Sequence, residues 1–348
     1  MRTTPCPALR NRAFPRRRVS IVWPGRASAP GARRARAVGG RRTRRPQNKE
    51  REMAQEKIGF VGTGFMGHGM AKNILAAGYP LTVIAHRNRA PVEDLLSRGA
   101  SEAATLEELA RASSIVFICA PGSPQVEAIV EALSDGLDAG DVVVDCSTAD
   151  PVSTAQLAET LAARGVHMAD APLGGTPVQA EEGTLSAMIG ADPEVFDRIR
   201  PVVETWAANI VRIGATGDGH KMKLLNNFLS LGYAALYAEA LALGEKVGLS
   251  RETFDSVIRG SRMDCGFYQT FMGYVIEGNR EAHKFTLSNA FKDLRYLESL
   301  ADDAGLANPV GNAAKNSFAM ACADGGDGPE DYVPHLADFV ARRNGLDR

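Results

Sequence analysis

The sequence lacks several features that would place the protein in a specialised class. No run of 18 or more apolar residues occurs among its 348 residues, which argues against a membrane span. Its six histidines show no metal-ligand spacing, so we expect no metal site. Cysteine is scarce, odd in number and without a Cys-x-x-Cys pair, at Cys6, Cys119, Cys146, Cys265 and Cys322. This usage predicts reduced, mostly buried thiols in a cytoplasmic protein rather than disulfides.

Acidic side chains are missing from the start of the chain. Residues 1–53 contain 15 Arg, one Lys and two Glu, a net charge of +14, and no acid precedes Glu50. Three interpretations stay open: a disordered basic arm, a mitochondrial transit peptide, or a natural start at Met53 with the preceding residues an artefact of start-site choice. Only the second would make the protein mitochondrial. Under all three we expect residues 1–53 to lie outside the fold.

The rest of the chain has the opposite charge. Its 24 basic and 39 acidic side chains give a net charge of −15. An acidic body repels a phosphate backbone, so we expect no nucleic-acid partner.

Short apolar strands alternate with helical stretches from residue 57 onward. The strands expected are 57–61, 81–85, 115–120, 142–146, 166–170, 185–190 and 209–214. Strands without polar alternation are typical of a parallel sheet covered by helices on both faces. After residue 214 the pattern becomes helical almost to the end. We therefore predict an α/β Rossmann domain at 54–215, a doubly wound parallel sheet, followed by an all-helical domain at 216–348 for substrate binding and dimerisation.

The stretch Gly62-Thr63-Gly64-Phe65-Met66-Gly67 follows the first expected strand and opens an expected helix. This is the context that a G-x-G-x-x-G dinucleotide motif requires. Gly62 would allow the tight turn, Gly64 would let pyrophosphate approach the backbone, and Gly67 would let the helix pack on the sheet. The helix N-terminus, with Phe65 and Met66 beside it, would then face the phosphates.

The residues after the second strand indicate which dinucleotide binds. An NAD site would offer a carboxylate to the ribose about twenty residues after the glycine motif. Here the sequence is Ala85-His86-Arg87-Asn88-Arg89, and the nearest acid is Glu93. Cationic side chains there, principally His86 and Arg87, suit a 2′-phosphate. The prediction is NADP, with NAD as the alternative.

A polar stripe interrupts a long apolar helix expected at 222–247. Lys223, Asn226, Asn227 and Ser230 are spaced i, i+3, i+4 and i+7, so they share one face. A solvated face would carry Glu, Lys and Arg rather than two amides and a hydroxyl. The stripe is therefore a candidate site.

Several motifs occur in a familiar order along the chain: FVGTGFMGHGMAKNIL, DCSTADP, DAPLGGTPVQAEEGTLSAMIG, GDGHKMKLLNN and AFKDL. In this order they resemble the β-hydroxyacid dehydrogenase family, which includes 3-hydroxyisobutyrate dehydrogenases and the tartronate semialdehyde and sulfolactaldehyde reductases. The resemblance covers nearly all of residues 55–340. It implies an NAD(P)-dependent oxidoreductase that interconverts a small β-hydroxy acid and its semialdehyde.

The resemblance also assigns roles to residues. The family pattern G-x-G-x-x-x-K-x-x-N-N matches residues 217–227, which makes Lys223 the catalytic acid/base and Asn227 its companion. Lys292 matches a lysine near the cofactor, and Ala120 and Thr148 match loops that touch the nicotinamide half. Asn226 and Ser230 would face the substrate.

Chemistry agrees with this assignment. Oxidising a hydroxy acid removes a hydride to the nicotinamide and a proton from the hydroxyl, and a side chain must take that proton. A desolvated lysine near a second lysine would have its pKa lowered toward the working pH.

One motif departs from the family. Many members read DAPVSGG where this chain has Asp170 to Thr176, so the usual serine is replaced by Gly174. The sulfolactaldehyde branch has an arginine where this chain has Gly175. We expect the backbone of Gly174, Gly175 and Thr176, with the Thr176 hydroxyl, to hold the substrate acid group.

Two other functions stay open. Imine reductases resemble this architecture, but they usually lack the lysine. A non-catalytic nucleotide-binding module is the other alternative. The long apolar helix also predicts self-association, and the resemblance implies a homodimer or homotetramer.

Overall fold

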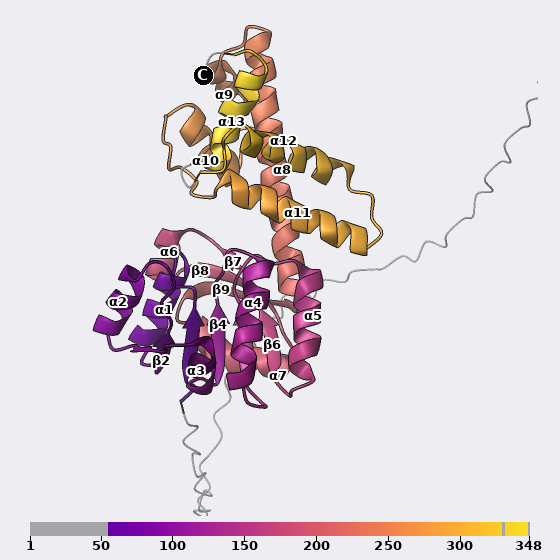
Figure 1. Cartoon of the computed structure of the whole chain (residues 1–348). Helices are drawn as coiled ribbons and strands as arrows, with labels where there is room; N and C mark the ends of the chain where they lie inside the picture. Colours follow the sequence, from indigo (N-terminus) through magenta and orange to yellow (C-terminus); the bar gives the residue numbers. More distant parts are fainter. Residues whose placement is uncertain (1–54, 329–330, 347–348) are drawn as a thin grey trace, which may run out of the picture. The chain divides into compact units, whose positions relative to one another are not determined.

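The computed structural model describes residues 55–328 and 331–346, which belong to one compact unit (Figure 1). The basic segment predicted at 1–53, with Cys6, lies outside the described residues. No helix among the described residues has the length and apolar character needed to cross a bilayer.

A single, mostly parallel sheet forms the first part of the fold. Its strands within the described residues are β1 Ile58–Val61, β2 Leu81–Val83, β3 Ser101–Glu102, β4 Ile115–Ile118, β5 Val142–Asp145, β6 His167–Asp170, β7 Leu173–Gly174, β8 Leu185–Gly190 and β9 Ala207–Gly214. They lie in the order β3-β2-β1-β4-β5-β6-β8-β7, and β9 pairs with β8. Strands β1 to β6 are parallel throughout, as predicted.

Helices cover both faces of this sheet. They are α1 Gly67–Ala76, α2 Ala90–Ser97, α3 Leu106–Arg111, α4 Ser123–Leu133, α5 Pro151–Ala162, α6 Pro177–Glu182 and α7 Pro193–Val203, with a 3-10 turn at Ser134–Gly136. Because side chains alternate along a strand, Phe117 packs on one face with α1, α2 and α7, while Val116 packs on the other with α3, α4 and α5. The doubly wound architecture is confirmed.

The sheet departs from the parallel pattern at one place. Strand β8 runs antiparallel to β6 and β7 and parallel to β9. The bridge that joins β6 to β8 pairs Asp170 with Gly190. A Cβ on Gly190 would lie 2.3 Å from Asp170 Oδ1, so glycine is needed for the two strands to meet.

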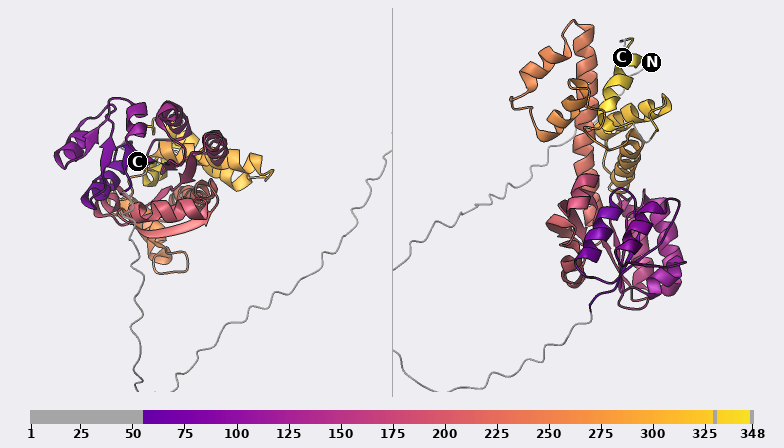
Figure 2. Two further views of the ribbon diagram at one scale, coloured as in Figure 1. Left: turned by 90° about the horizontal axis from the view of Figure 1, so that it is seen from below. Right: turned by 90° about the vertical axis from the view of Figure 1, so that its left-hand side faces the viewer.

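The second part is all-helical, as predicted. It contains α8 Asp218–Lys246, α9 Arg251–Ile258, α10 Gly266–Val275, α11 Leu287–Asp303, α12 Pro309–Ala323 and α13 Leu336–Arg343, with a 3-10 turn at Val333–His335. Helix α8 starts against β8 and β9 and continues between α11, α12 and α13 (Figures 1 and 2). It therefore carries side chains from the edge of the sheet into the helical core.

Helix α8 is less buried than its apolar sequence suggested. Its face toward α11 and α13 is buried, at Leu224, Leu231, Ala234 and Ala238. The opposite side is exposed in this chain, with Leu229 at 57% and Leu236 at 63% of full exposure. Periodicity in the sequence cannot show which apolar side chains lack a covering element within their own chain.

Candidate active site

The glycine motif connects β1 to α1 in a backbone that only glycine allows. Gly62 has φ +96°, and a Cβ there would lie 2.2 Å from the carbonyl oxygen of Cys119. A Cβ on Gly67 would lie 2.0 Å from the carbonyl oxygen of Gly62. Nothing lies within 4 Å of a Cβ built on Gly64, which is exposed. The turn is therefore tightly packed at both ends and open in the middle, where a pyrophosphate would approach.

The N-terminus of α1 lies at the open side of the glycine turn. Phe65 is 88% exposed and Met66 is partly exposed, so their peptide groups lie at the surface of the loop. An α-helix of ten residues presents unpaired N–H groups and a partial positive charge at this end. The loop and helix therefore fit the phosphates of a dinucleotide.

Two of the three cationic side chains after β2 are available for a ligand. His86 and Arg87 are exposed and form no hydrogen bond or salt bridge with the described residues. Arg89 instead binds Glu102 through two hydrogen bonds of 3.0 and 3.1 Å. Its guanidinium is thus engaged by the neighbouring strand, which leaves His86 and Arg87 facing the solvent.

The polar stripe of α8 meets α11 at a buried carboxylate. Asn227 Nδ2 donates a 2.7 Å hydrogen bond to Oδ2 of Asp293, and these side chains are 5% and 2% exposed. Lys292 Nζ lies 3.0 Å from Oδ1 of the same carboxylate, an ion pair without hydrogen-bond alignment. Lys223 lies one turn before Asn227 and forms no hydrogen bond or salt bridge with any described residue. Its ammonium group is therefore free to meet a ligand.

The surroundings of Lys223 act on its proton affinity in both directions. Burial lowers the pKa of Lys223 from its ordinary value, the Asp293 carboxylate raises it, and the Lys292 ammonium lowers it again. The net result is a lowered pKa, as the sequence led us to expect. A lysine with a lowered pKa gives up its proton more readily, which suits proton exchange with a substrate.

Lys292 joins α11 to the loops that follow β4 and β5. Its Nζ donates to the carbonyl oxygens of Pro121 at 2.7 Å and Thr148 at 3.0 Å. The backbone N–H of Ala120 donates to Ser147 Oγ at 2.9 Å, which links the two loops directly. Carboxyl ends of parallel strands are where ligands of such sheets bind. Lys292 therefore fixes the loops of Ala120 and Thr148 to α11, next to the Asp293 carboxylate that it pairs with.

The other residues of the stripe are placed differently. Asn226 is exposed, and the Ser230 hydroxyl donates back to the Asn227 carbonyl at 3.2 Å. The structure brings Lys223 and Asn227 to the buried carboxylate of Asp293, while Asn226 and Ser230 lie at the margin of this group.

The segment 174–176 is less free than the sequence suggested. Thr176 caps α6: its N–H donates to Gln179 Oε1 at 2.9 Å, and its hydroxyl accepts from Gln179 N–H. Gly175 is exposed with φ +128° and carries no side chain. Binding of an acid group by Thr176 would therefore compete with the capping box of α6.

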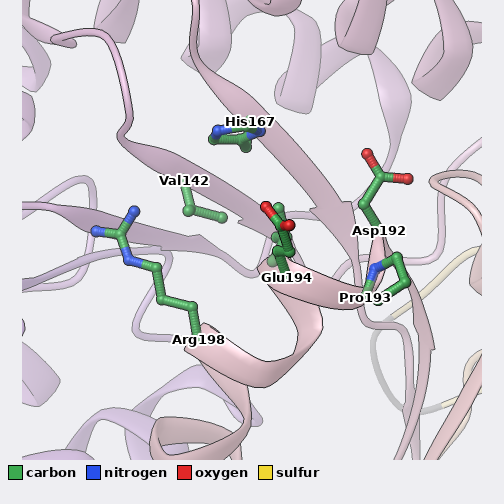
Figure 3. A pocket seen from close by; sticks show the side chains of 7 residues that line it. Val142, His167, Asp192, Pro193, Glu194 and Arg198 are labelled. Atoms are coloured by element: carbon green, nitrogen blue, oxygen red, sulfur yellow. The ribbon is translucent and has the colours of Figure 1, made fainter.

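A cavity lies at the other end of the sheet. It has a volume of about 400 Å³ and is lined by the first residues of β5 and β6 and by the start of α7: Val142, His167, Asp192, Pro193, Glu194, Val195 and Arg198 (Figure 3). Arg198 there is paired with Glu56 at 2.7 Å. These are amino ends of strands, away from the glycine motif and Lys223. A smaller cavity of about 250 Å³, lined by Pro124, Gln125, Lys292, Arg295 and Tyr296, adjoins the candidate site.

Sequence reasoning missed Asp293, the buried carboxylate of this site. Asp293 follows Lys292 directly, and neighbours on a helix are not expected to share a face. The signal that would have found it is a carboxylate inside an otherwise apolar helix face.

Known proteins match nearly all of the described chain. Residues 57–214 match the family of the NAD binding domain of 6-phosphogluconate dehydrogenase, and residues 217–334 match the NAD-binding region of NADP-dependent 3-hydroxyisobutyrate dehydrogenase. The chain is 36% identical to 2-(hydroxymethyl)glutarate dehydrogenase of Eubacterium barkeri over 76% of this chain and 85% of that protein. It is 29% identical to 3-sulfolactaldehyde reductase of Escherichia coli over 79% and 93%.

A solved structure shares the whole architecture. 3-Hydroxyisobutyrate dehydrogenase of Mycobacterium tuberculosis, solved with L-serine, superposes with a TM-score of 0.73 at 25% identity, covering 81% of this chain and 98% of that one. The glycine loop, the sheet and the helical part therefore form one inherited unit. The chain belongs to the β-hydroxyacid dehydrogenase family of NAD(P)-dependent oxidoreductases.

Proposed function

We propose that the protein is an NADP-preferring enzyme that interconverts a small β-hydroxy acid and its semialdehyde, with Lys223 as the acid/base. The observation that carries this proposal is the unpaired ammonium of Lys223, whose pKa responds to both Asp293 and Lys292, while Lys292 binds the loops after β4 and β5. A lysine without a protein partner in a desolvated site is costly unless it serves a ligand.

Each residue of the site has a distinct task in this mechanism. Gly62, Gly64 and Gly67 would hold the dinucleotide phosphates at the N-terminus of α1, and the bound nicotinamide would exchange the hydride. Lys223 Nζ would give its proton to the carbonyl oxygen during reduction and take it from the hydroxyl during oxidation. Asn227 would keep the Asp293 carboxylate in place. The negative charge of Asp293 would then offset part of the lowering of the Lys223 pKa.

The fold does not identify the substrate, so a panel of candidate substrates must be assayed. The panel should contain 3-hydroxyisobutyrate, 2-(hydroxymethyl)glutarate, and the semialdehydes of tartronate, methylmalonate and succinate, with sulfolactaldehyde. NADPH oxidation or NADP⁺ reduction followed by absorbance reports turnover of each. Strong turnover of one acid supports the proposal. Turnover of cyclic imines alone would favour an imine reductase, and dinucleotide binding without any turnover would favour a non-catalytic module.

The coenzyme preference rests on His86 and Arg87. Replacing Arg87 with alanine should weaken NADPH binding roughly 10-fold or more and leave NADH binding nearly unchanged, because a charge-assisted contact to the 2′-phosphate contributes about 1.5–3 kcal/mol. Arg89→Ala is the matched control, since Arg89 is engaged by Glu102. Fluorescence titration of both coenzymes measures the effect. Tighter NADH than NADPH binding by the unmodified protein would contradict this assignment.

Substitutions of Asp293 and Lys292 should shift the pH dependence of kcat for reduction in opposite directions. Reduction needs the protonated amine, so kcat is full below the pKa of Lys223 and falls as the pH rises through it. Asp293 raises this pKa, so Asp293→Asn should shift the fall to lower pH. Lys292 lowers it, so Lys292→Gln should shift the fall to higher pH. Profiles of kcat at saturating substrate test both signs, and a common direction would refute the assignment.

The exposed side of α8 supports a homodimer. Apolar side chains spaced three, four or seven residues apart follow it along its length and just past its end: Met222, Leu225, Leu229, Tyr233, Leu236, Leu243 and Val247. We expect this stripe to pack against a second copy, in a dimer or in a tetramer built from dimers. Light scattering should show that Leu229→Glu with Leu236→Glu dissociates the assembly. Val310→Glu, at an equally exposed site on α12, should not.

The two regions of the chain have different proposed roles. We assign the coenzyme to residues 54–215, and the substrate face and self-association to residues 216–348. We also propose a cytoplasmic location. Because we assign the whole activity to the chain from residue 54 onward, a variant that begins at Met53 should be fully active.

A further inference from the structure

The loop that follows β5 is held at two successive carbonyl groups by side chains from two different helices. Lys292 of α11 donates to the Thr148 carbonyl at 3.0 Å. His220 of α8 donates its Nε2–H to the preceding carbonyl, that of Ser147, at 3.1 Å. The loop lies at the carboxyl edge of the sheet, where dinucleotides bind in folds of this kind. Because Lys223 follows His220 by three residues on α8, the His220 contact joins the helix of the proposed acid/base to the coenzyme edge of the sheet.

Groups from three elements fix the ring of His220, which is fully buried. Its Nδ1 is joined to the hydroxyl of Thr154 on α5 at 2.8 Å, a hydrogen bond that forms whichever of the two atoms donates. Oδ2 of Asp145 at the end of β5 lies 3.7 Å from Nε2, and Oδ2 of Asp170 at the end of β6 lies 3.8 Å from Nδ1. The backbone N–H of His220 also donates to Asp170. The ring is therefore held in one orientation.

The loop on the other side of this contact is fixed as well. The N–H of Ser147 donates to Oδ1 of Asp145 at 2.9 Å. The hydroxyl oxygen of Ser147 accepts the N–H of Ala120, from the loop after β4, at 2.9 Å. The Ser147 carbonyl is thus a fixed point on the coenzyme edge of the sheet, and His220 holds α8 to it.

The polar cluster around His220 is a poor source of net stability. Asp145 and Asp170 are fully buried, and Oδ2 of Asp145 forms no hydrogen bond with any described residue. Burial raises the pKa of Asp170, and His220 acts in the opposite direction. Apolar side chains of similar volume often replace such a cluster without loss of stability, even though removing one member alone is costly. What the cluster supplies is direction, because its hydrogen bonds aim the ring at Ser147.

We propose that His220 is a positioning residue, which sets the place of Lys223 relative to the bound coenzyme by holding the first turn of α8 on the Ser147 carbonyl. Residues three apart on a helix share a face and are about 4.5 Å apart along its axis, so a shift of His220 carries Lys223 with it. His220 itself touches neither substrate nor coenzyme. This inference rests on the proposed function, and it names the contact that aligns the proton donor with the hydride donor.

The test follows a single turnover in the variant His220→Phe, which keeps a ring in the space and removes both nitrogens. Enzyme loaded with coenzyme is mixed with the most active substrate of the panel, and the coenzyme absorbance is followed by stopped flow. The amplitude reports the fraction of competent enzyme, and the rate constant reports hydride transfer. We expect the rate constant to fall roughly 10- to 100-fold, because a misplacement of about 1 Å has this effect on reacting groups. The amplitude and the NADPH affinity should stay near those of the unmodified enzyme, whereas a purely structural role would lower the amplitude and leave the rate constant unchanged.

Two amide variants test the contact itself and do not depend on how the phenylalanine variant folds. Glutamine places its amide near the position of Nε2, so His220→Gln can still donate to the Ser147 carbonyl and should stay within about fivefold of the unmodified rate constant. Asparagine places its amide near the position of Nδ1. His220→Asn can therefore keep only the Thr154 contact, and its rate constant should fall as in the phenylalanine variant.

His167→Phe is the matched control, because His167 is an exposed residue at the amino end of β6. It should leave both the rate constant and the amplitude unchanged. An unchanged rate constant in His220→Phe, or equal rate constants in the two amide variants, would overturn the positioning role. An unmodified enzyme that turns over no substrate of the panel would instead overturn the proposed function itself.

Discussion

Replacing Lys223 with methionine lowers kcat by roughly 10²- to 10⁴-fold in both directions, the range expected when a positioned acid/base is removed. Methionine retains the length and the apolar stem of lysine, so the packing of α8 is preserved while the proton carrier is lost. The affinity for NADPH should stay within about twofold of the unmodified enzyme, because Lys223 has no role at the glycine motif. Steady-state rates and coenzyme titration together measure this result.

The matched control lies two residues earlier on the same helix. Lys221 is exposed and pairs with Asp218 at 2.9 Å, a contact that leaves it outside the group of Asn227 and Asp293. Lys221→Met should therefore change kcat by less than about twofold, since exposed ion pairs contribute little. A Lys223→Met enzyme that keeps more than about a tenth of its rate would show that solvent or another group carries the proton.

Much of the coenzyme site could be predicted from the sequence because it is local. A glycine motif needs a strand before it and a helix after it, and both are visible as short-range patterns at β1 and α1. The steric need for Gly62 and Gly67 follows from contacts with Cys119 and within the turn itself. The motif and the elements that flank it are adjacent in sequence, so periodicity and turn chemistry predict the turn, although the contact of Gly62 with Cys119 joins distant parts of the chain.

The proton-transfer group could be predicted only in part. Lys223 and Asn227 share a helix face, and their spacing is enough to place them together. Asp293 comes from a helix 66 residues further along, and its contact with Asn227 depends on how α11 packs on α8. No pattern within either helix encodes that packing, which is why the carboxylate was missed.

The capping of α6 shows a further limit. Thr176 followed three residues later by Gln179 is a capping-box pattern, and it was visible in the sequence. The same threonine also stood in the motif that resembles a substrate-binding segment. One hydroxyl had two candidate partners, and only the structure shows that Gln179 already occupies it.

Removing the carboxylate of Asp170 should destabilise the fold more than an ordinary cap substitution does. Asp170 ends β6 and is fully buried, and its two oxygens accept the N–H groups of Gly217 at 2.5 Å and His220 at 2.6 Å. It therefore caps α8 from a distant strand. Asp170→Ala leaves both N–H groups buried and unpaired, which should cost about 3–5 kcal/mol in the free energy of unfolding. Chemical denaturation without coenzyme measures this loss.

Asp150→Ala provides the comparison, because Asp150 caps α5 by accepting from Val152 N–H at 3.0 Å within its own segment. That loss should be about 1 kcal/mol. Asp170→Asn keeps the shape and should fall between the two, with kcat reduced as well, since Lys223 lies in the second turn of the helix that Asp170 fixes. If Asp170→Ala were no more destabilising than Asp150→Ala, α8 would be held in place by its packing alone, and the position of Lys223 would not depend on the end of β6.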